Sequence, residues 1–126
     1  MIDGVKSVML YVDNQEQSIE FWTETLGFVI KSENNITDEF KSVEVAPSQD
    51  SGTSIVIFDK EFIREVSPEV NLGTPSLMFQ VKDLNALYED LNTKGIRCGD
   101  IVETPSGRVF NFSDHEDNYF AVNEVK

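Results

Sequence analysis

A short strand-like pattern occurs twice in this chain, and it constrains the fold more than any other feature. The stretch SVMLYVDN at residues 7–14 returns loosely as SLMFQVKD at residues 76–83. At a distance of 69 positions three residues agree: Ser7 with Ser76, Met9 with Met78, and Val12 with Val81. Three small or apolar matches can arise by chance, so the repeat is judged by the segments that follow each strand.

Each of the two strands is followed by a polar stretch with helical spacing and then by a glycine. In the first copy, the apolar stripe before Gly27 consists of Ile19, Trp22 and Leu26. In the second copy, the stripe before Gly95 consists of Leu84, Leu87 and Leu91. Glycine ends a helix readily because it adopts a positive φ without a steric penalty. The sequence therefore predicts one helix after each strand.

Short runs suited to β-strands follow each glycine. In the first copy these are FVIKSE, FKSVEVA and TSIVIFD, and in the second they are IRCGDIVE, RVFNFS and NYFAVNE. Between the copies, residues 60–75 contain Pro and Gly and show no clear period, which is typical of a linker. We therefore predict an α+β fold with a single domain, 1–126, in which βαβββ units at 1–59 and 76–126 flank this linker.

Alternation along the first strand of each unit predicts one covered face and one face that looks away from the helix. The uniformly apolar positions should lie beneath the helices; they are Val8, Leu10 and Val12 in the first unit and Leu77, Phe79 and Val81 in the second. The intervening positions should face away; they are Ser7, Met9 and Tyr11, and then Ser76, Met78 and Gln80. This mixture of small, flexible and polar side chains is typical of the lining of a ligand cavity.

The chain resembles the vicinal oxygen chelate superfamily, which includes glyoxalase I, extradiol dioxygenases, fosfomycin-resistance enzymes and bleomycin-resistance proteins. Two segments resemble its strand, turn and helix: VMLYVDNQEQSIEFWTETLGF and SLMFQVKDLNALYEDLNTKGI. A third, SGRVFNFSDHEDNYFAVNE, is similar to its closing hairpin, with His115 where the family usually has Pro and Asp117 where it has Gly. Asp tolerates a positive φ better than most residues, so we expect this turn to form. The resemblance implies tandem units that build a curved mixed sheet around a cavity.

Metal-dependent members of this superfamily hold one divalent ion with His, Gln and Glu from the first and last strands of both units. The resemblance carries these ligand positions over to Ser7, Ile57, Ser76 and Ala121. A neutral hydroxyl is a poor ligand, and Ile and Ala offer no donor. Asp59, two residues beyond Ile57, would add only one carboxylate. We therefore predict no metal site and no cofactor.

Other catalytic constellations are also missing from the sequence. The single His115 lies in the expected hairpin turn, where we interpret it as an exposed turn residue, so no Cys-His or Ser-His-Asp set can be assembled. The single Cys98 cannot form a disulfide within the chain and is assigned no role. Arg108 is interpreted either as an anchor for an anionic ligand or as a solvated strand end.

Charge and hydropathy exclude two classes of partner. The net charge of -13, from 23 acidic and 10 basic residues, argues against nucleic acid because little would neutralise a row of phosphates. No run approaches the roughly 20 apolar residues needed to span a bilayer, and Met1 does not begin a secretory signal pattern. We therefore expect a cytoplasmic protein with no membrane partner.

The leading functional hypothesis is a metal-free small-molecule binding protein of the bleomycin-resistance type, which sequesters a ligand in the sheet cavity. The predicted lining residues are Met9, Tyr11, Met78, Gln80, Asn111 and Tyr119. For each of them, packing at a protein interface is the alternative. A homodimer is expected because an exposed concave apolar face is costly for a monomer, and the cavity forms either within one chain or across that dimer.

Whether the chain is an enzyme stays open at this level. The second hypothesis is a glyoxalase- or dioxygenase-like enzyme, a lyase or a dioxygenase, with an atypical or lost metal site. In that case Tyr11 or Tyr119 would serve as a proton donor only if a neighbour lowered its pKa. A third hypothesis is a protein-interaction module, which a cavity filled by side chains would favour.

Overall fold

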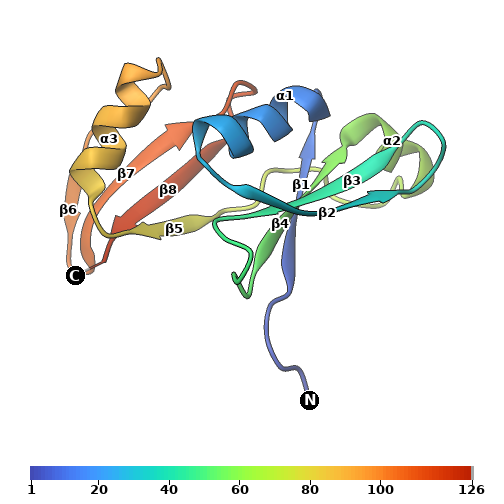
Figure 1. Cartoon of the computed structure of the whole chain (residues 1–126), viewed down its shortest axis with the longest axis horizontal. Helices are drawn as coiled ribbons and strands as arrows, with labels where there is room; N and C mark the ends of the chain where they lie inside the picture. The colour runs from blue at the N-terminus through green and yellow to red at the C-terminus, as the bar shows by residue number, and fades with distance from the viewer. Residues whose placement is uncertain (126) are drawn as a thin grey trace. The chain divides into compact units, whose positions relative to one another are not determined.

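The computed structural model describes residues 1–125, and the chain divides into two compact units with the boundary between Pro75 and Ser76. Each unit is built on its own four-stranded mixed sheet (Figure 1). Both sheets are open, because each has two different strands at its edges. The α+β class and the pair of β-rich units, each with a helix after its first strand, confirm the fold predicted from the repeat.

The first unit contains four strands, two helices and a π-helical turn. In chain order these are β1 (Ser7–Val12), α1 (Gln15–Glu20), η1 (Phe21–Thr25), β2 (Val29–Asn35), β3 (Lys41–Ala46), β4 (Ser54–Asp59) and α2 (Lys60–Val66). The strand order in the sheet is β1-β4-β3-β2, so the first and last strands are neighbours and run parallel. The other pairs are antiparallel.

The first helix ends at Gly27 as its sequence predicts, but its hydrogen-bond register changes before that end. Asn14 caps it, because the side-chain oxygen accepts a hydrogen bond of 3.0 Å from the amide of Gln17. Gly27 follows with a φ of 77°, as expected. Between them, the π-helical turn shifts the buried side, since Leu26 N donates to Phe21 O across five residues.

This shift changes which residues of the predicted stripe are buried. Trp22 is fully buried, but Ile19 and Leu26 are only half-buried, and Phe21 joins the core instead. The stripe of the second unit needs no such correction at its ends, because Leu84 and Leu91 are fully buried.

Helix α2 lies at the start of the segment expected to be a linker. Asp59 caps this helix by accepting a hydrogen bond of 3.1 Å from the amide of Phe62. Phe62 and Ile63 are buried, and the ring of Phe62 stacks on that of Phe40 with centroids 4.8 Å apart. Part of the segment 60–75 is therefore packed into the first unit.

The second unit repeats the plan with shorter elements. They are β5 (Met78–Val81), α3 (Leu84–Thr93), β6 (Val102–Thr104), β7 (Gly107–Ser113) and β8 (Tyr119–Glu124), in the sheet order β5-β8-β7-β6. Of the expected strand IRCGDIVE, only its end is a strand, and Cys98 makes an isolated bridge to Phe112. Gly95 ends α3 with a φ of 78°, and Asp117 has the predicted positive φ, 60°, in the hairpin turn.

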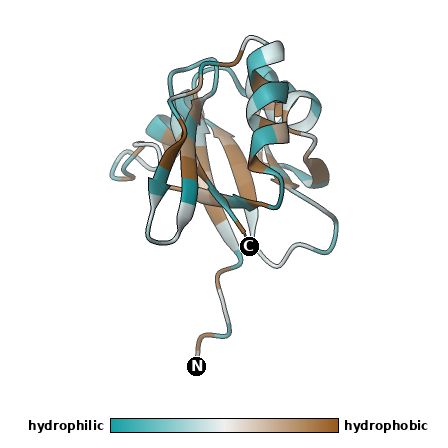
Figure 2. Ribbon diagram, turned by 90° about the vertical axis from the view of Figure 1, so that its left-hand side faces the viewer, coloured by the Kyte–Doolittle hydropathy of each residue, from teal (hydrophilic) through white to brown (hydrophobic). Residues whose placement is uncertain are grey.

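Each unit has its own hydrophobic core beneath its helices. In Figure 2 the strongly hydrophobic colour is concentrated on the strands. The fully buried side chains of the first unit include Leu10, Val12, Trp22, Val43 and Ile57. Those of the second unit include Leu84, Leu91, Phe110 and Val122, and the ring of Tyr88 meets that of Phe110 edge to face at 5.1 Å. The predicted covered face of β1 is confirmed at Leu10 and Val12.

Candidate functional site

One face of the first sheet carries the exposed methionine of β1. Met9 is paired with Val56 on β4, Val56 with Glu44 on β3, and Glu44 with Ser32 on β2, so these side chains form one row across the sheet. Tyr11 and Phe58 are paired in the neighbouring row, and their rings lie 5.8 Å apart. We call this the Met9 face; its residues are Met9, Tyr11, Ser32, Glu44, Ser54, Val56 and Phe58.

The opposite rows of the same sheet are buried, so the Met9 face is the one that looks away from the core. Leu10, Ile57 and Val43 are paired in the alternate row, and all three are fully buried. Met9, in contrast, exposes 40% of its surface. The parity predicted for β1 is therefore confirmed.

The second sheet has a corresponding face. Met78 is paired with Ala121 on β8, and Ala121 with Asn111 on β7. We call this the Met78 face; its residues are Met78, Gln80, Val109, Asn111, Tyr119, Ala121 and Asn123. Met78 exposes 61% and Tyr119 49% of their surface, and Gln80 and Asn111 are also exposed. Four of the six predicted lining residues thus share the Met78 face, and Met9 and Tyr11 share the Met9 face.

A carboxylate held by two hydroxyls occupies the Met9 face. Ser32 Oγ donates a hydrogen bond of 2.9 Å to Glu44 Oε1, and Ser54 Oγ donates one of 2.5 Å to Glu44 Oε2. The hydroxyls of Ser54 and Ser32 hold the pKa of Glu44 below its ordinary value, and the positive charges of Lys31 and Lys6 act in the same direction. Glu44 is therefore ionised at neutral pH.

Glu44 was missed by reasoning from the sequence, although a signal was present. In the row Met9, Val56, Glu44 it takes the place that Asn111 takes in the row Met78, Ala121, Asn111. Asn111 was predicted to line the site. The repeat applied to the third strands, VEV against FNF, aligns the two residues, but at a distance of 67 positions instead of 69.

The positions carried over from the metal-dependent relatives do not fit a divalent metal ion. Ser7 is paired with Ser54, and Ala121 with Met78, so both strand ends offer hydroxyl or apolar groups. The position carried over to Ile57 is wrong, because Ile57 is buried against the core; the preceding residue, Val56, is the one that lies on the Met9 face beside Met9. A slip of one residue along a strand moves a side chain to the other face. Within residues 1–125 no group of three or more His, Cys, Asp or Glu side chains is placed to hold a metal.

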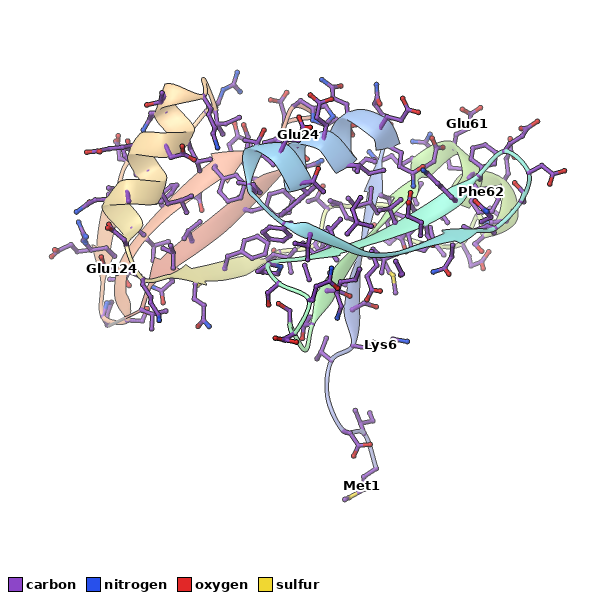
Figure 3. The ribbon with its side chains drawn as sticks, viewed as in Figure 1. Met1, Lys6, Glu24, Glu61, Phe62 and Glu124 are labelled. Atoms are coloured by element: carbon purple, nitrogen blue, oxygen red, sulfur yellow. The ribbon has the colours of Figure 1, made fainter. Side chains whose placement is uncertain are left out.

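The remaining charged residues singled out in the sequence have structural partners. Arg108 donates to both carboxylate oxygens of Glu124, at 3.1 and 2.7 Å, and to Asn85 on α3 at 3.2 Å. It therefore lies on the side of the second sheet opposite to Val109 and the Met78 face; Glu124 is labelled in Figure 3. His115 lies in the β7–β8 turn with its Nε2 3.3 Å from a carboxylate oxygen of Glu116.

The charged side chain of Arg97 lies beside the hydroxyl group of Tyr119. Arg97 Nη1 lies 3.4 Å from Tyr119 Oη and 3.3 Å from Asp117 Oδ1, and this guanidinium is largely exposed. A donor at that distance makes a weak hydrogen bond.

In the described part of the chain, residues 1–125, no helix has the length and apolar character needed to cross a membrane.

Comparisons with known proteins agree with this architecture. The family model described as the Glyoxalase/Bleomycin resistance protein/Dioxygenase superfamily matches residues 4–122. The uncharacterized protein YetH of Bacillus subtilis (strain 168) is 30% identical over 125 residues, which cover 98% of this chain and 100% of YetH.

Solved structures give the same result. TnmS3, an antibiotic binding protein from Streptomyces sp. CB03234, has a TM-score of 0.83 at 26% identity, covering 99% of this chain and 98% of TnmS3. A superfamily member from Sphaerobacter thermophilus DSM 20745 shares the fold, with a TM-score of 0.82 at 23% identity over 98% of both chains. The chain therefore belongs to the glyoxalase/bleomycin resistance protein/dioxygenase superfamily.

Proposed function

We propose that this protein binds a small organic molecule on the outward face of each sheet, the Met9 face and the Met78 face, and that it acts by sequestering that molecule without a metal ion. The observation that carries the proposal is the repeated row of a methionine, a small apolar residue and a polar residue on the two faces. Thioether and aromatic groups supply polarisable contact surface, and a few polar groups orient a ligand.

The chemistry of the donor set favours binding over metal-assisted catalysis. The ligand positions of metal-dependent relatives correspond to hydroxyl and aliphatic groups here, which do not polarise a substrate oxygen as a metal would. Membership in a superfamily that includes binding proteins and enzymes does not by itself choose between them. The likeness to TnmS3, which is described as antibiotic binding, supports a small-molecule ligand.

The proposal includes a cytoplasmic homodimer. The exposed side chains of the second sheet include three large apolar or aromatic groups, Met78, Val102 and Tyr119. A surface of this kind is costly to leave in water, so covering it with a second copy or with a ligand stabilises the protein.

The test uses the three methionines as reporters. The sequence contains Met1, Met9 and Met78, so labelling the methionine methyl groups with 13C gives three NMR signals. Titration with 1-naphthylmethanol, a neutral aromatic probe, should shift the Met9 and Met78 signals. Met1, which is fully exposed before β1 (Figure 3), serves as the internal control. No selective shift up to millimolar probe would contradict the proposed binding function.

A further inference from the structure

We infer that Glu44 selects the ligand by charge, so that the preferred ligand of the Met9 face carries a protonated amine beside an apolar or aromatic body. This inference rests on the proposed binding function and adds the chemical class of the ligand. It is built on the position of Glu44, on its hydrogen bonds and on the neighbours that share its face.

The position of Glu44 is that of a lining residue. Its row runs from Met9 through Val56 to Glu44, and the equivalent row of the second sheet ends at the neutral Asn111. The two units therefore place different polar groups at one position of a common plan. An amide both donates and accepts hydrogen bonds, whereas a carboxylate only accepts, so Glu44 discriminates more strongly among ligand groups.

The carboxylate of Glu44 is held in one orientation but can still accept further hydrogen bonds. Each of its oxygens accepts one hydrogen bond, from Ser32 on β2 and from Ser54 on β4. A carboxylate has about four acceptor sites, so a further donor can be accommodated on each oxygen. Ser54 is buried and Glu44 is half-buried, so the carboxylate is held in place while a ligand can still contact it. Preorganisation of this kind lowers the entropic cost of binding.

The neighbours of Glu44 on the Met9 face determine how strongly its charge acts on a ligand. Among the described strand residues of the Met9 face it is the single carboxylate, and Met9, Val56 and the paired rings of Tyr11 and Phe58 are neutral. Two cations are near enough to influence it. Lys31 Nζ donates to the carbonyl oxygen of Ser51 at 3.1 Å, and Lys6 precedes β1 (Figure 3).

A purely structural role for Glu44 is the competing explanation, because its hydrogen bonds link β2, β3 and β4. Such a role predicts that removing the charge changes stability and affects all ligands alike. Charge selection predicts a different result, in which only the ranking of ligands by charge changes. The experiment must therefore compare matched ligands on one variant.

Three naphthalene probes carry a cationic, a neutral and an anionic group on the same ring methylene: 1-naphthylmethylammonium, 1-naphthylmethanol and 1-naphthylacetate. Their dissociation constants are measured on the full chain from the Met9 methyl signal at neutral pH and low salt. We expect the cation to bind about three- to tenfold more tightly than the alcohol, and the anion more weakly, as for a partly screened charged hydrogen bond. This ranking in the wild type does not depend on whether any variant folds.

Glu44→Gln should remove the preference for the cation, so that the ratio between the dissociation constants of the alcohol and the cation falls to about one. The matched control is Glu33→Gln on β2, which removes the same charge from the opposite face of the same sheet, where Glu33 pairs with Lys41 at 2.9 Å. Glu33→Gln should keep the wild-type ranking, because its charge is exposed and screened.

The outcomes separate the two proposals. Equal binding of cation and alcohol by the wild type, or an equal loss of preference in the two variants, would overturn charge selection by Glu44 while leaving the binding function intact. Failure of the alcohol to shift the Met9 signal would instead contradict the proposed function itself.

Discussion

Met9 and Met78 occupy equivalent places in the two sheets. Each lies on the first strand of its unit and is paired in parallel with a small apolar residue of the fourth strand, Val56 and Ala121 respectively. Both are exposed, although Met is a side chain that usually packs inside a protein. Their exposure in the same row of both units is the basis of the proposed ligand contacts.

Truncating these methionines should cost little stability. We expect Met9→Ala and Met78→Ala to lower the free energy of unfolding by less than about 1 kcal/mol, as is usual for exposed positions. Leu10→Ala, at the fully buried neighbour of Met9, should cost about 2–5 kcal/mol because it leaves a cavity. Chemical denaturation measures all three. Losses at the methionines as large as that at Leu10 would place them in a core.

Removing the hydroxyl of Ser54 should raise the pKa of Glu44. The hydrogen bond from Ser54 is the largest influence that lowers this pKa, and that from Ser32 is the next. Ser54→Ala should therefore raise it more than Ser32→Ala does. An NMR titration of the 13C-labelled side-chain carboxyl carbons follows the change, and the reverse order would contradict the hydrogen bonds assigned here.

The stability that the ionised Glu44 contributes should disappear in acid. Because folding lowers the pKa of Glu44, its contribution is complete above the pKa of the unfolded chain, about 4.3, and is lost as the pH falls through the lower folded-state value. The difference in unfolding free energy between wild type and Glu44→Gln should thus be constant from pH 7 to 5 and shrink below. Urea denaturation across this range measures it. A difference that grows on acidification would mean that folding raises this pKa.

The purified protein should hold no stoichiometric divalent metal ion. Ser7, Val56, Ser76 and Ala121 offer hydroxyl and aliphatic groups at the positions that correspond to ligands in metal-dependent relatives. Elemental analysis after mild purification without chelators is the measurement. About one equivalent of Ni, Zn, Fe or Mn per chain would refute the metal-free proposal.

The protein should be a homodimer at micromolar concentration. Light scattering should give about twice the chain mass of 14.3 kDa, since pairing covers exposed apolar side chains such as Val102 on the edge strand β6. Val102→Lys, which introduces a charge there, should weaken the dimer, whereas Ile36→Lys in the β2–β3 loop is the control. A wild-type mass of one chain would exclude this assembly.

Local features of the fold were predictable because short-range physics controls them. Gly27 and Gly95 end their helices with positive φ, and Asp117 takes the left-handed conformation in the hairpin turn. Alternation along β1 placed Met9 and Leu10 on opposite faces. Each of these predictions depends on residues a few positions apart, so the sequence contains the information directly.

Other features depend on partners that the sequence pattern does not reveal. The π-helical turn at Phe21–Thr25 changed which side of the first helix is buried. The ligand position carried over to Ile57 falls on the wrong face because the sequence does not reveal which β4 residue pairs with which β1 residue. Nothing next to Glu44 in the sequence distinguishes it from a solvated strand residue, and only the alignment of VEV with FNF across the repeat points to it.

By itself the sequence determined that the chain forms two similar units, where their helices end and which side chains of the first strands look outward. Spacing of 3.6 and 2 residues and the φ preference of glycine are sufficient for that. Only the tertiary structure decided that Glu44 is a fixed carboxylate, because its partners Ser54 and Ser32 lie 10 and 12 positions away on two other strands. Strand register, set by the packing of the whole unit, brings those hydroxyls to its two oxygens.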